Sequence, residues 1–192
     1  MRYRSMFVLA CAFCLSARLA LGGAPVKIPY VIYADGEDEE GLYSPSGYMG
    51  STDAIDMNPL CHENPHSGKS CIKVTFTDPN GWGGVVWQNP PNNWGDTEGG
   101  LNLTGAKQLT FWARGEKGGE EVEFKMGVIG KDKRFYDSTK AGLMRLKLSK
   151  EWKKYTIGVM GRDLTRIMTP FVFSVAGQSG PVVFYIDDIV YE

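Results

Sequence analysis

The chain has 192 residues, of which 43% are hydrophobic and 12% aromatic, and its formal net charge is −1. Its lysines and arginines are scattered and form no basic stripe, so the sequence excludes nucleic acid and anionic membrane surfaces as partners. The length suits one domain with a single hydrophobic core.

The first residues have the order of a secretory signal peptide. Arg2 and Arg4 precede an apolar run over residues 6–15, and small residues follow up to Ala24. This order is typical of a cleaved export signal, and the run is too short to cross a bilayer. We therefore predict a signal peptide over 1–24, a domain over 25–192 without a membrane span, and a secreted, periplasmic or cell-surface location. Cys11, inside the run, leaves lipidation as an alternative.

Beyond residue 25 the sequence shows the pattern of β-strands. Apolar residues recur at alternate positions in short runs, which are separated by clusters rich in glycine, proline and asparagine. The pattern predicts an all-β fold, a two-sheet antiparallel β-sandwich with no second domain. The polar stretch 35–68 is predicted to be loop. The predicted strands span 27–34, 71–77, 83–88, 108–114, 122–129, 143–148, 154–159, 171–176 and 182–191.

Alternation also separates core from surface within these strands. Leu109, Phe111 and Ala113 share one face of their strand, which we predict to be buried, and Trp112 points the other way. A slip of one residue would bury charges, so the register is well specified. The inward residues of the next strand are predicted to be Val122, Phe124, Met126 and Val128.

Two cysteines remain after the predicted cleavage, Cys61 and Cys71. They bracket a short loop rich in proline, histidine, glycine and serine, and in an oxidising compartment such a pair is more often bonded than free. We predict a Cys61–Cys71 disulfide, with reduced thiols as the alternative.

The densest group of aromatic and polar residues lies around residues 82–94. Sugar recognition needs this mixture, because the C–H face of a pyranose packs on an aromatic ring while amides and carboxylates bond its hydroxyls. Trp87 shares a strand face with Val85 and is predicted to be core, whereas Trp82 and Trp94 are predicted to be exposed. The candidate carbohydrate-binding residues are Trp82, Trp94, Tyr48, Gln88, Asn92, Asn93, Trp112, Arg114, Glu123 and Tyr136.

Three segments, 64–74, 108–115 and 184–190, carry a family resemblance. A Ser-Gly-Lys turn entering a strand, a Phe-Trp-Ala-Arg strand and a closing strand with paired aspartates look like the galactose-binding-like jelly rolls, in particular carbohydrate-binding modules. The resemblance implies a jelly-roll sandwich that binds oligosaccharide or polysaccharide without catalysis. It also implies a partner glycan-degrading enzyme, which such modules usually serve.

The resemblance further implies a structural calcium between the first loop and the last strand. The matching residues are Asp187 and Asp188, with backbone carbonyls near Ser67 to Lys69. Calcium prefers six to eight oxygen ligands, which carboxylates beside a carbonyl-rich loop can supply. Adjacent strand residues point to opposite faces, so only one of the two aspartates should ligate, and we favour Asp187. The acidic run 35–40 is a second, less favoured candidate.

Two other function classes stay open. A small glycan-active hydrolase or lyase could use Glu121 and Glu123, or Asp96 and Glu98, because such enzymes need two carboxylates about 5–10 Å apart. No nucleophile elbow surrounds any serine, and we interpret both histidines as surface loop residues. The third possibility is a protein-interaction domain on the same sandwich.

Overall fold

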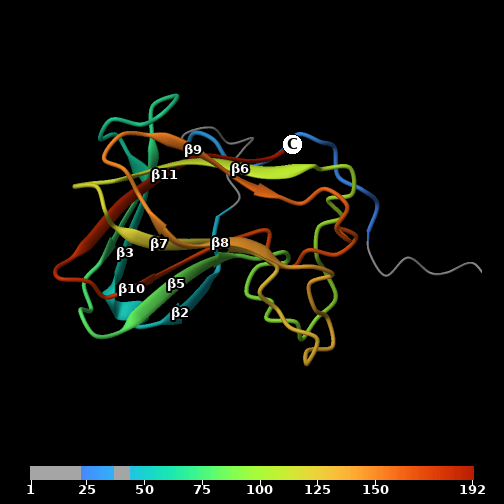
Figure 1. The fold of residues 1–192 in the computed structure, drawn as a ribbon. Coiled ribbons are helices and arrows are strands. Elements are labelled where there is room, and N and C mark those ends of the chain that lie inside the picture. The colour runs from blue at the N-terminus through green and yellow to red at the C-terminus, as the bar shows by residue number, and fades with distance from the viewer. Residues whose placement is uncertain (1–22, 37–43) are drawn as a thin grey trace, which may run out of the picture.

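The computed structural model describes residues 23–36 and 44–192, and these form two antiparallel sheets packed face to face. Figure 1 shows the sheets as stacked layers. The six-stranded sheet has the order β3-β4-β11-β6-β9, with β1 also paired to β11. Its strands are β1 (Tyr30–Tyr33), β3 (Ile55–Cys61), β4 (Cys71–Phe76), β6 (Gln108–Gly115), β9 (Lys153–Gly158) and β11 (Val182–Tyr191).

The five-stranded sheet has the order β2-β5-β10-β7-β8. The all-β, two-sheet jelly-roll sandwich predicted from the sequence is therefore confirmed. Within the described residues, no helix is long and apolar enough to cross a membrane. The strands of this sheet are β2 (Gly47–Gly50), β5 (Trp82–Trp87), β7 (Glu121–Met126), β8 (Ala141–Lys147) and β10 (Phe171–Ala176).

The core lies between the sheets, where the predicted inward faces meet. Phe111 of β6 packs on Phe124 of β7 with ring centroids 4.5 Å apart, and Phe171 lies 5.4 Å from Phe111. Trp87 is fully buried, as predicted, and meets Phe171 edge to face. Val128 was predicted to point inward, but its side chain is 37% exposed because β7 ends at Met126.

The stretch 35–68 was predicted to be loop, and this prediction is wrong for part of it. It contains β2, a short 3-10 turn at Thr52–Ala54, and β3. Both strands lie at sheet edges, where polar residues and a proline are tolerated because one side of the strand makes no ladder hydrogen bonds. β3 contains Pro59, and a proline in a sequence argues against a strand because it cannot donate a ladder hydrogen bond.

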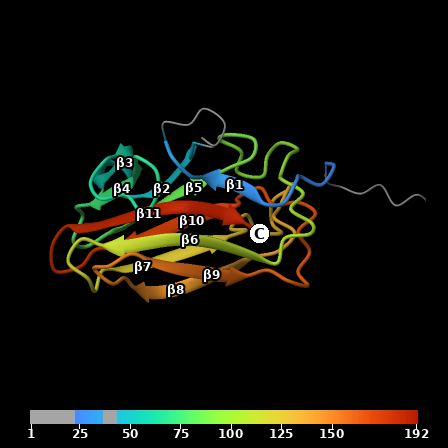
Figure 2. The ribbon, with the colours of Figure 1, turned by 90° about the horizontal axis from the view of Figure 1, so that it is seen from above.

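β11 is the strand that organises the six-stranded sheet. It pairs with β6 along one side, and on its other side with β4 through Val182–Ile186 and then with β1 near its end. Figure 2 shows β1 beside β11 on this side. The change of partner coincides with a register shift between Asp187 and Val190, and Asp188 has a positive φ of 48°. The paired aspartates therefore sit where the ladder is interrupted.

Candidate functional site

The outer face of the five-stranded sheet, which we call the open face, carries an accessible tryptophan. Trp82 is 50% exposed and lies opposite Ala176 of β10, on the side of the sheet that faces away from the core. Beside it is an open pocket of about 460 Å³. The pocket is lined by Trp82, Glu121, Val122, Glu123, Lys125, Arg145, Ser174, Val175 and Ala176. The structure thus brings together two predicted sugar-binding residues, Trp82 and Glu123.

The floor of this pocket holds a fixed polar centre. Lys125 Nζ lies 2.5 Å from Glu123 Oε2 and donates a 3.0 Å hydrogen bond to Ser174 Oγ, which in turn donates to Glu123 Oε2 at 3.1 Å. The hydrogen bond from Lys125 lowers the pKa of Glu123 below its ordinary value. Glu123 is therefore an ionised acceptor held in one orientation, which suits hydroxyl recognition.

A β-bulge in β8 shapes the next part of the open face. The pairing of β7 with β8 shifts register between Val122 and Phe124, so that Met144 and Arg145 both stand opposite Glu123. Both are exposed, and Arg145 has a positive φ of 49°. Bulges re-aim side chains and cluster next to functional sites. Here the bulge directs Arg145 into the pocket with Trp82 and Met144 into a neighbouring one.

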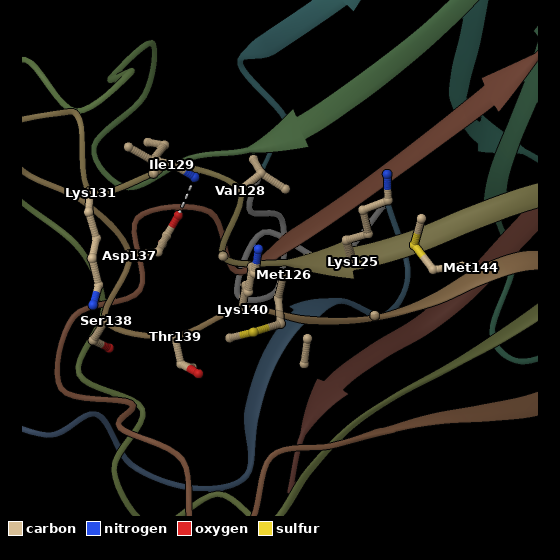
Figure 3. A pocket seen from close by; sticks show the side chains of 14 residues that line it. Lys125, Met126, Val128, Ile129, Lys131, Asp137, Ser138, Thr139, Lys140 and Met144 are labelled. Carbon is tan, nitrogen blue, oxygen red and sulfur yellow. Dashed lines mark hydrogen bonds between the residues drawn. The ribbon is translucent and has the colours of Figure 1, made fainter.

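The neighbouring pocket, of about 720 Å³, lies between the ends of β7 and β8 and the loop 127–140 (Figure 3). It shares Lys125 with the first pocket. Figure 3 shows Lys125, Lys131 and Lys140 around an apolar lining that includes Met126, Ile129 and Met144. The two pockets form one surface running from Trp82 to the loop.

Asp137 fastens this loop to the sandwich. Its carboxylate accepts hydrogen bonds from the N–H groups of Ile129, at 2.8 Å, and of Met168 and Thr169, and a further bond from Thr169 Oγ at 2.7 Å. Burial raises the pKa of Asp137. Because all its bonds are internal, we interpret Asp137 as a structural residue of the pocket wall.

In the loop that follows β5, the polar side chains of Gln88 and Asn93 form hydrogen bonds within the loop. Gln88 is fully buried and donates from Nε2 to the Asn93 carbonyl at 3.0 Å. Asn93 Oδ1 accepts the N–H groups of residues 95–97. The N–H of Asn92, which is exposed, donates to Ser46 Oγ. Trp94, predicted to be exposed, is only partly so and packs against Gly47, where an added Cβ would lie 2.8 Å from its ring.

Tyr48 and Tyr136 lie apart from Trp82. Tyr48 pairs with Val85, whose side chain is in the core, and it lines a separate cavity of about 250 Å³ at the sheet edge. Tyr136 lies in the loop 127–140, with the Arg166 guanidinium 4.6 Å from its ring centroid. The predicted set therefore does not form one site.

The outer face of the six-stranded sheet, which we call the covered face, lies beneath the loop 62–70. His66 stacks on Trp112 with ring centroids 3.7 Å apart. Arg114 donates to the Glu63 carbonyl at 3.0 Å and lies over the Tyr185 ring at 3.6 Å. Trp112 and Arg114, both predicted to bind sugar, contact this loop and lie apart from Trp82.

The paired aspartates lie under the same loop. Asp187 is fully buried, and its carboxylate accepts the N–H groups of His66 at 2.9 Å, Ser67 at 3.2 Å and Asp188 at 2.9 Å. Asp188 accepts a 2.8 Å bond from Ser67 Oγ, and its Oδ2 lies 2.7 Å from His66 Nδ1. Burial, reinforced by the neighbouring Asp188 carboxylate, raises the pKa of Asp187 to about 6.

Asp35, just after β1, holds the other half of the loop. Its carboxylate accepts the Lys69 N–H at 2.8 Å and the Ser70 hydroxyl at 2.6 Å. The Lys69 carbonyl lies 2.8 Å from His62 Nδ1. The remaining acidic residues of the run 35–40 lie outside the described residues.

The donor set under the loop can accept a cation. Ligand atoms of His66, Asp187 and Asp188 all lie within 4.8 Å of one another, the one such group of at least three among the described residues. Two carboxylates supply the hard oxygens that calcium prefers, and a cation would relieve the repulsion between them. Asp187 already accepts three backbone bonds, so Asp188 has more free lone pairs than the favoured Asp187.

The two cysteines are register partners across β3 and β4. Both are buried free thiols in the structure, so the predicted disulfide is not formed there. The Cys71 thiol donates to the Cys61 carbonyl at 3.6 Å.

The sequence matches no protein-family model and no curated protein. The fold, in contrast, is the β-sandwich found in carbohydrate-binding modules. The family 30 module of the cellulosomal cellulase Cel9D-Cel44B of Clostridium thermocellum superposes with a TM-score of 0.56 at 15% identity, covering 86% of this chain and 98% of that one. The family 11 module of the cellulosomal cellulase Lic26A-Cel5E of the same organism gives 0.55 at 16% identity, covering 84% and 94%.

A third solved structure is TmCBM61 in complex with β-1,4-galactotriose. It gives a TM-score of 0.50 at 22% identity, covering 80% of this chain and 93% of that one. At these identities the likeness establishes the shared fold, and the site has to be argued from this chain's own residues.

The sequence reasoning missed Arg145, Lys131 and Lys140. A signal for Arg145 was present, because the apolar residues of β8 run Ala141, Leu143, Leu146 and so break the alternation by one residue. Such a break is the sequence trace of a bulge. The lysines belong to a loop whose folding over β7 and β8 no local pattern indicates.

Proposed function

We propose that the protein is a non-catalytic glycan-binding module, and that it binds oligosaccharide or polysaccharide on the open face. The observation that carries this proposal is Trp82, half exposed beside a pocket with a fixed carboxylate at Glu123. An exposed indole gives a sugar ring its apolar platform, and oriented polar groups bond the hydroxyls. The shared fold with carbohydrate-binding modules supports the same conclusion.

The carboxylates of the open face are unsuited to glycoside hydrolysis. Glu121 lies 3.3 Å from Lys147, and Glu123 lies 2.5 Å from Lys125. A glycosidase acid needs a raised pKa, whereas the pKa of Glu123 is lowered. The two residues also share one strand and do not face each other across a cleft. These features favour binding over the hydrolase or lyase alternative.

Affinity electrophoresis through gels containing β-glucan, galactan or other polysaccharides tests the proposal. We expect at least one polymer to retard the protein, and Trp82→Ala to weaken that binding about 10- to 100-fold, the range for a central aromatic anchor. Met160→Ala is the matched control, because Met160 is 77% exposed and is not a lining residue of either pocket. Retardation by no glycan would reject the proposal and favour a protein-interaction domain, and release of sugar products would favour the enzyme.

We also propose that calcium binds beneath the loop 62–70, held by the Asp187 and Asp188 carboxylates with oxygens of the segment Ser67 to Lys69. The contacts of Ser67 with both aspartates support it, as does the grouping of His66, Asp187 and Asp188 ligand atoms within 4.8 Å of one another. When bound, the ion would neutralise two adjacent carboxylates and tie the loop to β11. Its role is structural, because the group lies on the covered face, away from Trp82.

We further propose that the protein is exported. The signal-peptide pattern of residues 1–24 supports export, and all but the last two of these residues lie outside the described residues. In an oxidising compartment Cys61 and Cys71, as register partners, would be placed to form a disulfide. We propose that the module serves a glycan-degrading partner enzyme by binding its substrate.

A further inference from the structure

We infer that the glycan bound on the open face is anionic, with carboxylate or sulfate groups that meet Arg145, Lys131 and Lys140. This inference rests on the proposed function and specifies its class of ligand. The charges that line the two pockets and the backbone that presents them support it.

The acidic groups of the open face already have partners. Glu121 pairs with Lys147 and Glu123 with Lys125. Asp137 accepts only internal hydrogen bonds, most of them from backbone N–H groups. Glu121 and Glu123 are thus already engaged in ion pairs, although the Glu123 charge also acts on Arg145.

Three cations lack such partners. Among the described residues, no carboxylate lies within ion-pair distance of Lys131, Lys140 or Arg145. Lys131 and Lys140 line the larger pocket (Figure 3), and Arg145 lines the smaller one, which shares Lys125 with it. Asp132 follows Lys131 in the chain but does not line either pocket. The formal net charge of the chain is −1, so this excess of positive charge is local.

The backbone conformation at Arg145 supports a role for its side chain in ligand binding. A φ of 49° is a conformation that glycine or asparagine adopts with less strain than arginine. Strain of this kind persists mainly where it serves a site. The bulge turns the arginine toward the pocket that contains Trp82, and a guanidinium matches the two oxygens of a carboxylate or sulfate.

The test compares matched polymers with and without their acidic groups. Polygalacturonate is set against its fully methyl-esterified form, and a sulfated galactan against the same galactan after desulfation, by calorimetry at low and high salt. We expect at least one acidic form to bind tenfold or more tightly than its neutral counterpart, with a preference that decreases as salt screens the contact. The pair that shows the preference identifies the acidic group.

Variants assign the preference to residues. Arg145→Gln and Lys140→Gln should each reduce the preference for the acidic form several-fold, and together they should abolish it. Lys107→Gln is the matched control, because Lys107 is an exposed lysine that lines neither pocket. Circular dichroism of each variant verifies folding.

Each outcome decides between the two proposals. Binding of neutral glycan that depends on Trp82, without preference for an acidic form, would overturn the inference and leave the proposed function intact. A preference that the Arg145 and Lys140 variants do not change would also overturn it, since the charge would then be recognised elsewhere. Absence of binding to every polymer would reject the proposed function itself.

Discussion

The two outer faces of the sandwich carry similar types of residue, but these residues have different surroundings. The covered face has Trp112, Arg114 and Asp187, each in contact with the loop 62–70. The open face has Trp82 and Arg145, which line pockets instead of contacting a loop. Residue type alone therefore does not distinguish a binding platform from a structural one, because the decisive difference is what covers the side chain.

The largest effect is expected from removing the buried Asp187 carboxylate of the covered face. Asp187→Ala leaves three N–H groups without their acceptor, and we expect it to lower the free energy of unfolding by about 3 kcal/mol. Trp82→Ala, on the open face, should change it by less than about 0.5 kcal/mol. Urea unfolding measures both, and a loss of stability that is as large for Trp82→Ala would contradict the distinction between the faces.

Calcium should act on the covered face alone. In protein stripped with a chelator, added calcium at about 100 times its Kd should stabilise the fold by about 2.7 kcal/mol. This corresponds to a rise in Tm of roughly 5–10 °C for a chain of this size. Asp188→Asn should reduce the rise, and magnesium serves as the control ion because it requires a tighter octahedral site. A midpoint that calcium does not move would reject the metal proposal.

A smaller effect is expected from pH in the absence of metal. The pKa of Asp187 is about 6 in the fold and ordinary, near 4, in the unfolded chain, so the native state binds the proton more tightly. Its contribution is therefore full below about pH 4 and is lost as pH rises through 6. Measured against Asp187→Asn, the stability of the native sequence should fall between pH 4 and 7.

Parallel pH profiles for the two proteins would contradict this expectation. Bound calcium favours the ionised carboxylate and so should flatten the difference between the profiles. The pH experiment therefore also sharpens the calcium test, because the two effects act through the same carboxylate.

The fold could be predicted from the sequence because alternating apolar residues mark most of the strands. The prediction failed for β2 and β3, which are edge strands with polar or proline residues. The metal candidates could be named from the sequence because the paired aspartates and the Ser-Gly-Lys turn are local motifs, and Ser67 of that turn contacts both aspartates.

The sugar candidates could be predicted only in part. Trp82 is flanked by glycines, and this marked it as exposed. Which sheet Trp112 and Arg114 belong to, and what covers them, depends on strand order and on a loop that closes over them. These are long-range properties, which composition and periodicity do not encode.

The position of β11 has a consequence for the order of events in folding. It is the last strand in sequence, yet it pairs with β1, β4 and β6 and connects strands made early with strands made late. The six-stranded sheet therefore cannot be complete until β11 has been synthesised. Such distant pairings close large loops, so the chain should fold slowly. Until β11 pairs, the apolar strands of this sheet have unpaired edges, which favour aggregation.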